Sequence, residues 1–179
     1  MQNQLTLNPI DFKLKGVDGK HYSLDDFADK KYLALIFSCN HCPYVVASER
    51  EMIEIQQEFA SNGLQIVAIN SNSFNKDYPA DSYENMIKRA KEKKFNFPYL
   101  NDEDQSISKA YGAGRTPEIY LYNESRNLVY HGRINDNPKE HSKITRHDFR
   151  EALTELVNGK QVSLPITNAL GCSIKYVSN

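Results

Sequence analysis

The chain has 179 residues, of which 40% are hydrophobic and 25% are charged. This length suits a single domain spanning residues 1–179, and the composition excludes collagen, low-complexity disorder and a coiled coil. The 22 Lys and Arg residues are balanced by 23 Asp and Glu residues, so the formal net charge of -1 argues against nucleic-acid binding. No apolar run approaches the length of a membrane span.

The amino-terminal residues Met1–Leu5 show no basic segment, apolar segment or cleavage site of the kind found in targeting signals. The sequence therefore predicts a cytoplasmic protein. Because the cytoplasm is reducing, paired cysteines there are more often catalytic or metal-binding than structural.

The first half of the chain alternates strand and helix patterns. Apolar and polar residues alternate around Asp18-Gly19, which predicts an amino-terminal β-hairpin within Phe12–Leu24. Continuous apolar runs predict buried strands, and helical periodicity or capping pairs predict helices. The expected elements that follow are a helical turn at 24–27, a strand at 32–37, a helix at 45–59, a strand at 64–70, and a helix from Asp81, paired with Glu84, to about residue 93.

The second half adds a helix, a late hairpin, a last helix and a tail. The expected elements are a helix opened by Asp102 with Gln105 and ending at Tyr111, strands at 117–123 and 128–134, and a helix at 146–157 capped by Thr145. The early strand–helix–strand unit implies a parallel pair, and the late hairpin implies an antiparallel edge. The predicted fold class is α/β, with a mixed central sheet, helices on both faces, an amino-terminal hairpin extension and a carboxy-terminal tail.

The motif Cys39-Asn40-His41-Cys42 lies between a predicted buried strand and a predicted helix. This spacing brings two sulfurs within reach of each other in the first helical turn. Unpaired N–H groups and the helix dipole favour a thiolate there, so we expect a lowered pKa for Cys39. His41 can add positive charge or a hydrogen-bond donor. Pro43 is tolerated in a first turn because it has no N–H to donate.

The sequence supports other roles for the two cysteines, such as metal binding, less well than it supports redox chemistry. A zinc site usually has four ligands, often from a second close pair of cysteines, and the only other cysteine of the sequence, Cys172, is 130 residues beyond Cys42. Two buried, inert cysteines are possible, but a Cys-x-x-Cys after a buried strand favours redox chemistry. A copper-binding module that uses both thiols and His41 or a distant His is a lower-ranked alternative.

Several segments together resemble a known family. They are Phe37–Tyr44, Asp102–Gln105, Ala110–Gly112, Thr116-Pro117-Glu118 and Gly171–Lys175. Over about residues 11–175 the chain is similar to the peroxiredoxin-like redoxins of the AhpC/TSA superfamily, which are often described as thiol-disulfide isomerase or thioredoxin-family proteins. The resemblance implies a thioredoxin-like fold and thiol-based redox chemistry.

The resemblance also assigns roles to individual residues. It implies that Cys39 attacks a substrate and that Cys42 resolves the mixed disulfide. Pro117 matches the cis-proline that faces the cysteines, and the backbone of Thr116 would be exposed to pair with an extended substrate strand. Cys172 is either a third redox cysteine, brought to the site by the tail, or a small buried residue.

The sequence departs from the family pattern at three positions. Leu33 stands where thioredoxins commonly bury a carboxylate. Arg115 stands where relatives often carry a cysteine, and it is a second candidate cation beside His41. The Pro-x-x-x-Thr/Ser-x-x-Cys motif of peroxiredoxins is missing, and Ile36 stands three residues before Cys39.

The sequence therefore predicts a thiol-disulfide oxidoreductase that needs no organic cofactor or metal. Its expected partners are a protein or small-molecule disulfide and a thioredoxin-like or small-thiol electron donor, without nucleic acid or membrane. A thiol peroxidase, in which Cys39 forms a sulfenate that condenses with Cys42, is the alternative.

Overall fold

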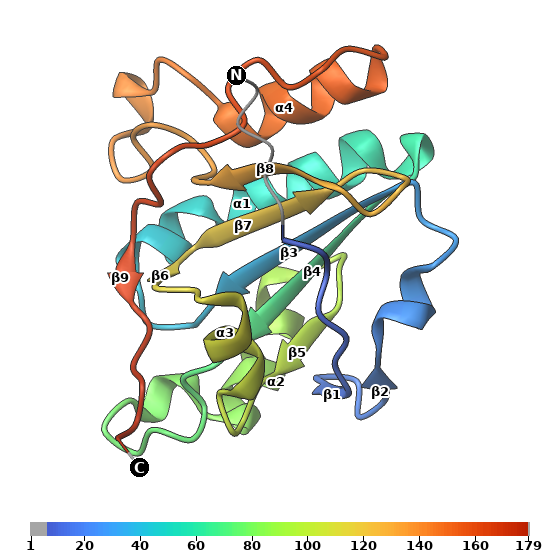
Figure 1. The fold of residues 1–179 in the computed structure, drawn as a ribbon. Coiled ribbons are helices and arrows are strands. Elements are labelled where there is room, and N and C mark those ends of the chain that lie inside the picture. Colours follow the sequence, from blue (N-terminus) through green and yellow to red (C-terminus); the bar gives the residue numbers. More distant parts are fainter. Residues whose placement is uncertain (1–6, 179) are drawn as a thin grey trace.

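Two largely apolar strands form the centre of the structure, which is a computed structural model that describes residues 7–178 (Figure 1). The strands β3 (Tyr32–Ser38) and β4 (Leu64–Asn70) pair in parallel. Nearly all their side chains are buried, because helices or loops cover both faces. The segment Met1–Leu5, on which the absence of a targeting signal was argued, lies outside the described residues.

Five further strands extend this pair into a mixed sheet with the order β2-β1-β5-β4-β3-β7-β8. They are β1 (Leu14–Gly16), β2 (His21–Tyr22), β5 (Tyr99–Asn101), β7 (Glu118–Tyr122) and β8 (Leu128–Gly132). The predicted amino-terminal hairpin and late hairpin are both confirmed as antiparallel pairs. The first hairpin is joined to the sheet because β1 also pairs with β5.

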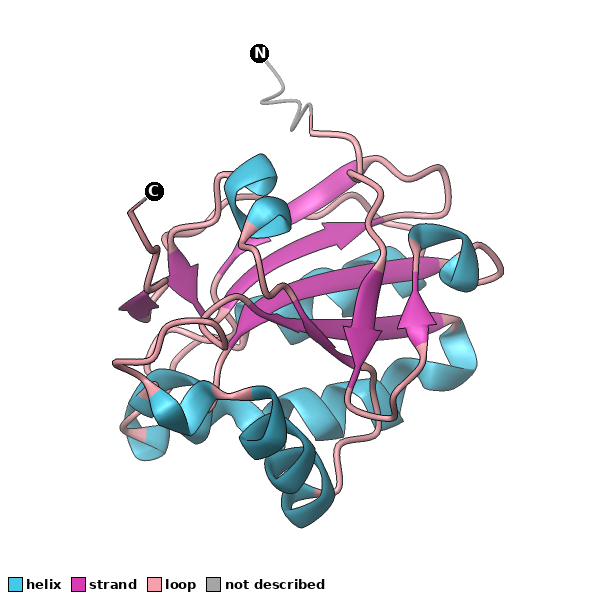
Figure 2. Ribbon diagram, turned by 90° about the horizontal axis from the view of Figure 1, so that it is seen from below, coloured by secondary structure: helices cyan, strands magenta, loops and turns pink. Residues whose placement is uncertain are grey.

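Within the described residues, four α-helices lie on the two faces of the sheet, which Figure 2 shows from below. They are α1 (Pro43–Phe59), α2 (Tyr83–Lys93), α3 (Ser106–Tyr111) and α4 (Asp148–Val157), and single 3₁₀ turns occur at 24–27, 60–62, 79–81 and 141–143. Buried residues of α1, α2 and α4 pack in one apolar cluster, and those of α3 and the 24–27 turn pack in the other. The predicted α/β class with helices on both faces is confirmed.

Three details of the expected elements are wrong. The strand β5 was not predicted, because three residues directly after Pro98 are too few to show a period. Thr145 does not cap the last helix: it bonds to Asp136, and α4 begins at Asp148. Ser82, not Asp81, caps α2, because its hydroxyl accepts the N–H of Asn85 at 3.3 Å.

A second, two-stranded sheet lies next to the amino-terminal end of α1. It pairs β6 (Arg115–Thr116) with β9 (Cys172–Ser173) in antiparallel register, with Thr116 opposite Cys172 (Figure 1). The pairing joins the predicted tail to the segment that precedes Pro117. None of the helices in the described part of the chain has the length and apolar character needed to span a membrane.

Candidate active site

The two cysteines of the motif lie between β3 and α1, as expected. Cys39 is 1% exposed and Cys42 is 0% exposed, and both are free thiols. The helix begins at Pro43, two residues before the predicted start at 45, and Cys42 is its N-cap, so the motif precedes the first helical turn in which it was expected. His41 therefore lies in a bend before the helix and not within its first turn.

Thr116 contacts both sulfurs from the neighbouring segment. Its hydroxyl lies 3.4 Å from Sγ of Cys39, and its carbonyl oxygen lies 3.2 Å from Sγ of Cys42. The peptide bond between Thr116 and Pro117 is cis, as the resemblance implies. Glu118 holds this loop, because its carboxylate accepts the backbone N–H groups of Gly114 and Arg115 at 2.8 and 2.9 Å.

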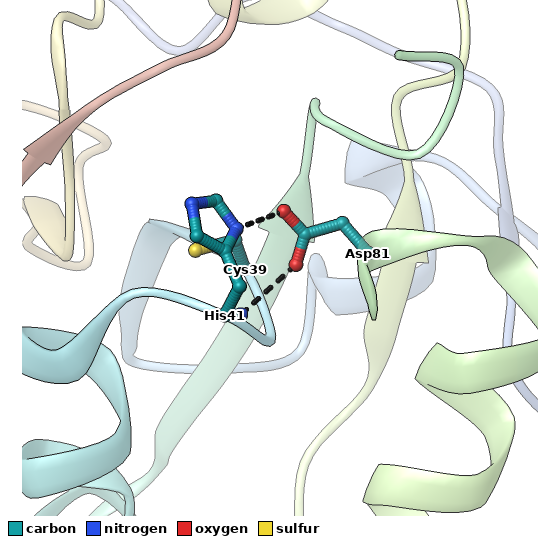
Figure 3. A group of neighbouring side chains, drawn as sticks. All are labelled: Cys39, His41 and Asp81. Carbon is teal, nitrogen blue, oxygen red and sulfur yellow. Dashed lines mark hydrogen bonds and ion pairs between the residues drawn. The ribbon is translucent and has the colours of Figure 1, made fainter. Parts of the chain in front are cut away.

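A buried carboxylate, that of Asp81, anchors the bend between the cysteines. Its Oδ1 accepts the backbone N–H groups of Asn40 at 2.6 Å and His41 at 3.0 Å. Its Oδ2 is paired with Nδ1 of His41 and accepts a bond from Asn72 at 3.2 Å. Figure 3 shows the imidazole and the carboxylate facing each other, with the Cys39 sulfur behind the imidazole ring. Asp81 therefore takes two amide donors that would otherwise be free to stabilise a thiolate.

Sequence reasoning missed Asp81, because its position before a helix is typical of a cap. The adjacent Ser82 provides that cap, which leaves the Asp81 side chain free to turn inward. Leu33, the position where thioredoxins commonly carry a buried acid, is fully buried among apolar residues. In this chain the buried acid near the thiols comes from the loop before α2 and not from β3.

The expected lowering of the Cys39 pKa is wrong. The hydrogen bond that Cys39 donates to Cys42 raises the pKa of Cys39, and burial and the charge of Asp81 raise it further. The same bond lowers the pKa of Cys42, and bonds from Cys172 and from the Val45 N–H at the start of α1 add to this effect. Burial acts in the opposite direction and favours the Cys42 thiol, as does the Thr116 carbonyl that accepts its S–H. Within the pair, the pKa of Cys42 is therefore lowered and that of Cys39 is raised.

The position of the thiolate can be tested by ultraviolet titration of the reduced protein. We expect Cys39→Ala to raise the pKa of Cys42, because it removes the largest stabilising bond, and Cys172→Ala to raise it less. Because the pKa of Cys42 is lower in the folded than in the unfolded chain, its contribution to the free energy of unfolding is lost as the pH falls through the folded value. An unchanged pKa in Cys39→Ala, or a larger effect of Cys172→Ala, contradicts this assignment.

The remaining candidate residues hold the site together. Asn40 donates through Nδ2 to the carbonyl of Ala80 at 2.9 Å and accepts the hydroxyl of Tyr99 at 2.9 Å. The exposed Arg115 donates through Nη1 to the carbonyl of Gly171 at 3.2 Å, so it anchors the tail. The backbone N–H of Cys172 lies 3.4 Å from the sulfur of Cys42.

The edge at Thr116 is already occupied. The resemblance implies a backbone free to pair with a substrate strand, but Thr116 is 1% exposed and pairs with Cys172 of β9. Gly171 lies against the same residue, since a Cβ added to it would be 2.0 Å from the Thr116 carbonyl oxygen. An extended substrate can pair with Thr116 only if β9 leaves this edge.

Three side chains offer metal-ligand atoms close together. One atom each from Cys39, His41 and Asp81 lies within 4.8 Å of the others, so Asp81 is a third ligand type that the sequence did not reveal. In the structure, however, the imidazole and the carboxylate are bonded directly to each other, and Asp81 also receives two amides. In this arrangement the carboxylate of Asp81 positions the bend, and two of the three donors are bonded to each other.

Comparisons with known proteins agree with the fold and the motif. Residues 8–131 match the AhpC/TSA family. A hypothetical protein from Sinorhizobium meliloti 1021 and an uncharacterized conserved protein from Geobacillus kaustophilus each have 36% identity and a TM-score of 0.89. Each match covers 99% of this chain and, respectively, 98% and 95% of the other chain.

A more distant structure is the exposed lipoprotein thioredoxin Etrx1 from Streptococcus pneumoniae strain TIGR4. It has 27% identity and a TM-score of 0.57, and the match covers 68% of this chain and 87% of that one. Among curated proteins, no sequence matches this chain. The family match spans more than half of the sequence, and the strand, Cys-x-x-Cys, helix and cis-proline are all in place, so the chain belongs to the AhpC/TSA family and has a thioredoxin-like fold.

Proposed function

We propose that this protein is a cytoplasmic thiol-disulfide oxidoreductase that works through Cys39 and Cys42. The observation that carries the proposal is the buried pair of free thiols, packed in one apolar cluster with both sulfurs against Thr116. The disulfide substrate is a protein or a small molecule. A thioredoxin-like protein or a small thiol returns the electrons, and no organic cofactor or metal takes part.

In the proposed reaction, the reduced pair carries one proton, which can move between the Cys39 and Cys42 sulfurs. Cys39 passes its proton along the hydrogen bond to the Cys42 thiolate and attacks one sulfur of the substrate disulfide. The substrate S–S bond breaks, and one substrate sulfur leaves as a thiolate. Cys42 then gives its proton to this leaving thiolate and becomes a thiolate itself. The Cys42 thiolate next attacks the Cys39 sulfur, which forms the Cys39–Cys42 disulfide and releases the second substrate sulfur as a thiolate. The substrate gains two electrons and the pair loses two.

Insulin-disulfide reduction tests the activity, and trapping tests the roles. We expect Cys39→Ser to lower the rate to that of the reductant alone. Cys42→Ser should accumulate a mixed disulfide with insulin, because Cys39 attacks but nothing resolves the product, whereas Cys39→Ser should not. Equal rates for wild type and Cys39→Ser would end the proposal. Accumulation in Cys39→Ser alone would reverse the two roles.

A thiol peroxidase is a second candidate, and the Thr116 hydroxyl beside Cys39 is the observation that favours it. Peroxiredoxins place a hydroxyl near the reactive sulfur from a motif that this sequence lacks, and here another segment supplies one. Stopped-flow mixing with hydrogen peroxide distinguishes the candidates. If the second-order rate constant for the reaction with hydrogen peroxide is no larger than that of a free low-pKa thiol, the protein is not a thiol peroxidase.

A further inference from the structure

The strand β9 brings a third thiol to the cysteine pair. Cys172 packs against the apolar cluster that contains Cys39 and Cys42. Its backbone N–H donates to the sulfur of Cys42 at 3.4 Å. No side-chain or backbone hydrogen bond joins Cys172 to Cys39 within residues 7–178. Cys42 is therefore the cysteine of the pair that Cys172 contacts.

The tail holds Cys172 in this place through contacts on both sides of β9. Arg115 Nη1 donates to the carbonyl of Gly171, and the N–H of Ile174 donates to the carbonyl of Gly114 at 3.1 Å. Further along, the N–H of Lys175 donates to Oδ1 of Asn72 at 2.8 Å. These bonds attach the tail to two loops and hold Cys172 beside the pair. The thiol is therefore already positioned for reaction, and the tail does not have to diffuse to the site first.

We propose that Cys172 is a third redox-active cysteine, which exchanges with Cys42. This rests on the proposed function, because the disulfide that it receives forms there. Cys172, as its thiolate, attacks the Cys42 sulfur of the Cys39–Cys42 disulfide. The Cys42–Cys172 bond forms, the Cys39–Cys42 bond breaks, and Cys39 leaves as a thiolate that takes up the proton Cys172 gave up. No net oxidation occurs, since one S–S bond replaces another.

The difference in burial between Cys172 and the other two cysteines indicates what the exchange does for the reaction. Cys39 and Cys42 are almost fully buried, whereas Cys172 is only partly buried and lies on a two-stranded edge. The exchange moves the disulfide from the buried pair to the most exposed of the three sulfurs. There a donor thiol reaches it without opening the pair itself, and Cys39 is free again.

Peptide mapping after trypsin digestion reads the exchange directly. Trypsin leaves Cys39 and Cys42 together on residues 32–50 and leaves Cys172 on residues 161–175. Wild-type protein is equilibrated in glutathione redox buffers, quenched with acid, alkylated and digested. We expect two oxidised species: peptide 32–50 with an internal disulfide, and peptides 32–50 and 161–175 linked to each other. Cys39→Ser should give mainly the linked pair.

Two variants test the partner and the register. Cys42→Ser should give about tenfold less linked peptide than Cys39→Ser, because the contact geometry favours Cys42 as the partner and a preorganised thiol has the higher effective concentration. The second variant moves the third cysteine by one residue: in the Cys39→Ser background, Cys172→Ser is combined with Ser173→Cys. This variant should also give little linked peptide, because neighbouring strand residues point to opposite faces and Ser173 is exposed.

The outcomes separate this proposal from the proposed function. Oxidised wild type that contains the internal disulfide but no linked peptides overturns the role of Cys172 and leaves the oxidoreductase intact. A wild type with no disulfide at any ratio of the buffer overturns both. More linked peptide in Cys42→Ser than in Cys39→Ser overturns the assignment of Cys42 as the partner.

Discussion

Replacing Gly171 with alanine is expected to expose the cysteine pair. An added Cβ would lie 2.0 Å from the carbonyl oxygen and 2.6 Å from the carbonyl carbon of Thr116, and both atoms belong to backbone that cannot rotate away. The strand β9 must therefore move off β6, which also breaks the bond from the Cys172 N–H to Cys42. A loss of about 1.4 kcal/mol in the pairing of this strand makes its open form tenfold more populated.

The measurement is the rate of iodoacetamide alkylation of Cys39 and Cys42 in the reduced, folded protein. We expect Gly171→Ala to raise this rate by about tenfold or more, because buried thiols react only through local opening. Gly114→Ala is the matched control, since its added Cβ meets no heavy atom within 4 Å and it precedes β6, the strand paired with β9. A Gly171→Ala rate equal to that of the control would show that β9 does not limit access to the pair.

Asp81→Asn is expected to lower the pKa of Cys39 while it destabilises the fold. Apart from the bond to Cys42 and burial, the charge of Asp81 is what raises the Cys39 pKa, and asparagine removes this charge. The substitution also leaves His41 and Asn72 facing an amide in place of one carboxylate oxygen. We expect the free energy of unfolding to fall by about 1–3 kcal/mol.

The pKa of Cys39 is best measured where it is the sole thiol, with Cys42→Ser and Cys172→Ser as the background. There Asp81→Asn should lower the pKa by about one unit, read from the pH dependence of alkylation, which raises the thiolate fraction about tenfold at neutral pH. The control is Asp102→Asn. This carboxylate is equally buried, but its bonds go to Ser71, Ile107 and Ser108. A Cys39 pKa that Asp81→Asn leaves unchanged or raises would refute this role of the charge.

The parts of the site that the sequence predicted are those encoded by a local pattern. The run at 32–37 is apolar throughout, as a strand covered on both faces must be, and Cys39 and Cys42 follow it directly. The family motif at Thr116-Pro117 correctly gave the cis bond. The strand and the motif depend on residues that are close neighbours in the chain, so periodicity and spacing describe them well, whereas the cis bond was implied by the family resemblance alone.

The parts that the sequence missed depend on contacts between distant segments. Asp81 reaches the bend at Asn40 and His41 from another loop, and its own neighbours indicate only a helix cap. The strand β9 has two residues and exists only because Thr116 lies opposite Cys172. The error in the Cys39 pKa has the same origin, because the dipole argument applied to the wrong cysteine once the helix began at Pro43.

Redox titration of the Cys39–Cys42 pair tests the central claim most directly. The protein is equilibrated in thiol–disulfide buffers of known potential, and the dithiol and disulfide forms are counted by mass after alkylation. The account predicts a two-electron transition at a potential less negative than thioredoxin's roughly −270 mV, because a stabilised Cys42 thiolate favours the reduced form. A potential equal to or more negative than thioredoxin's, or a pair that forms no disulfide in any buffer, would contradict it.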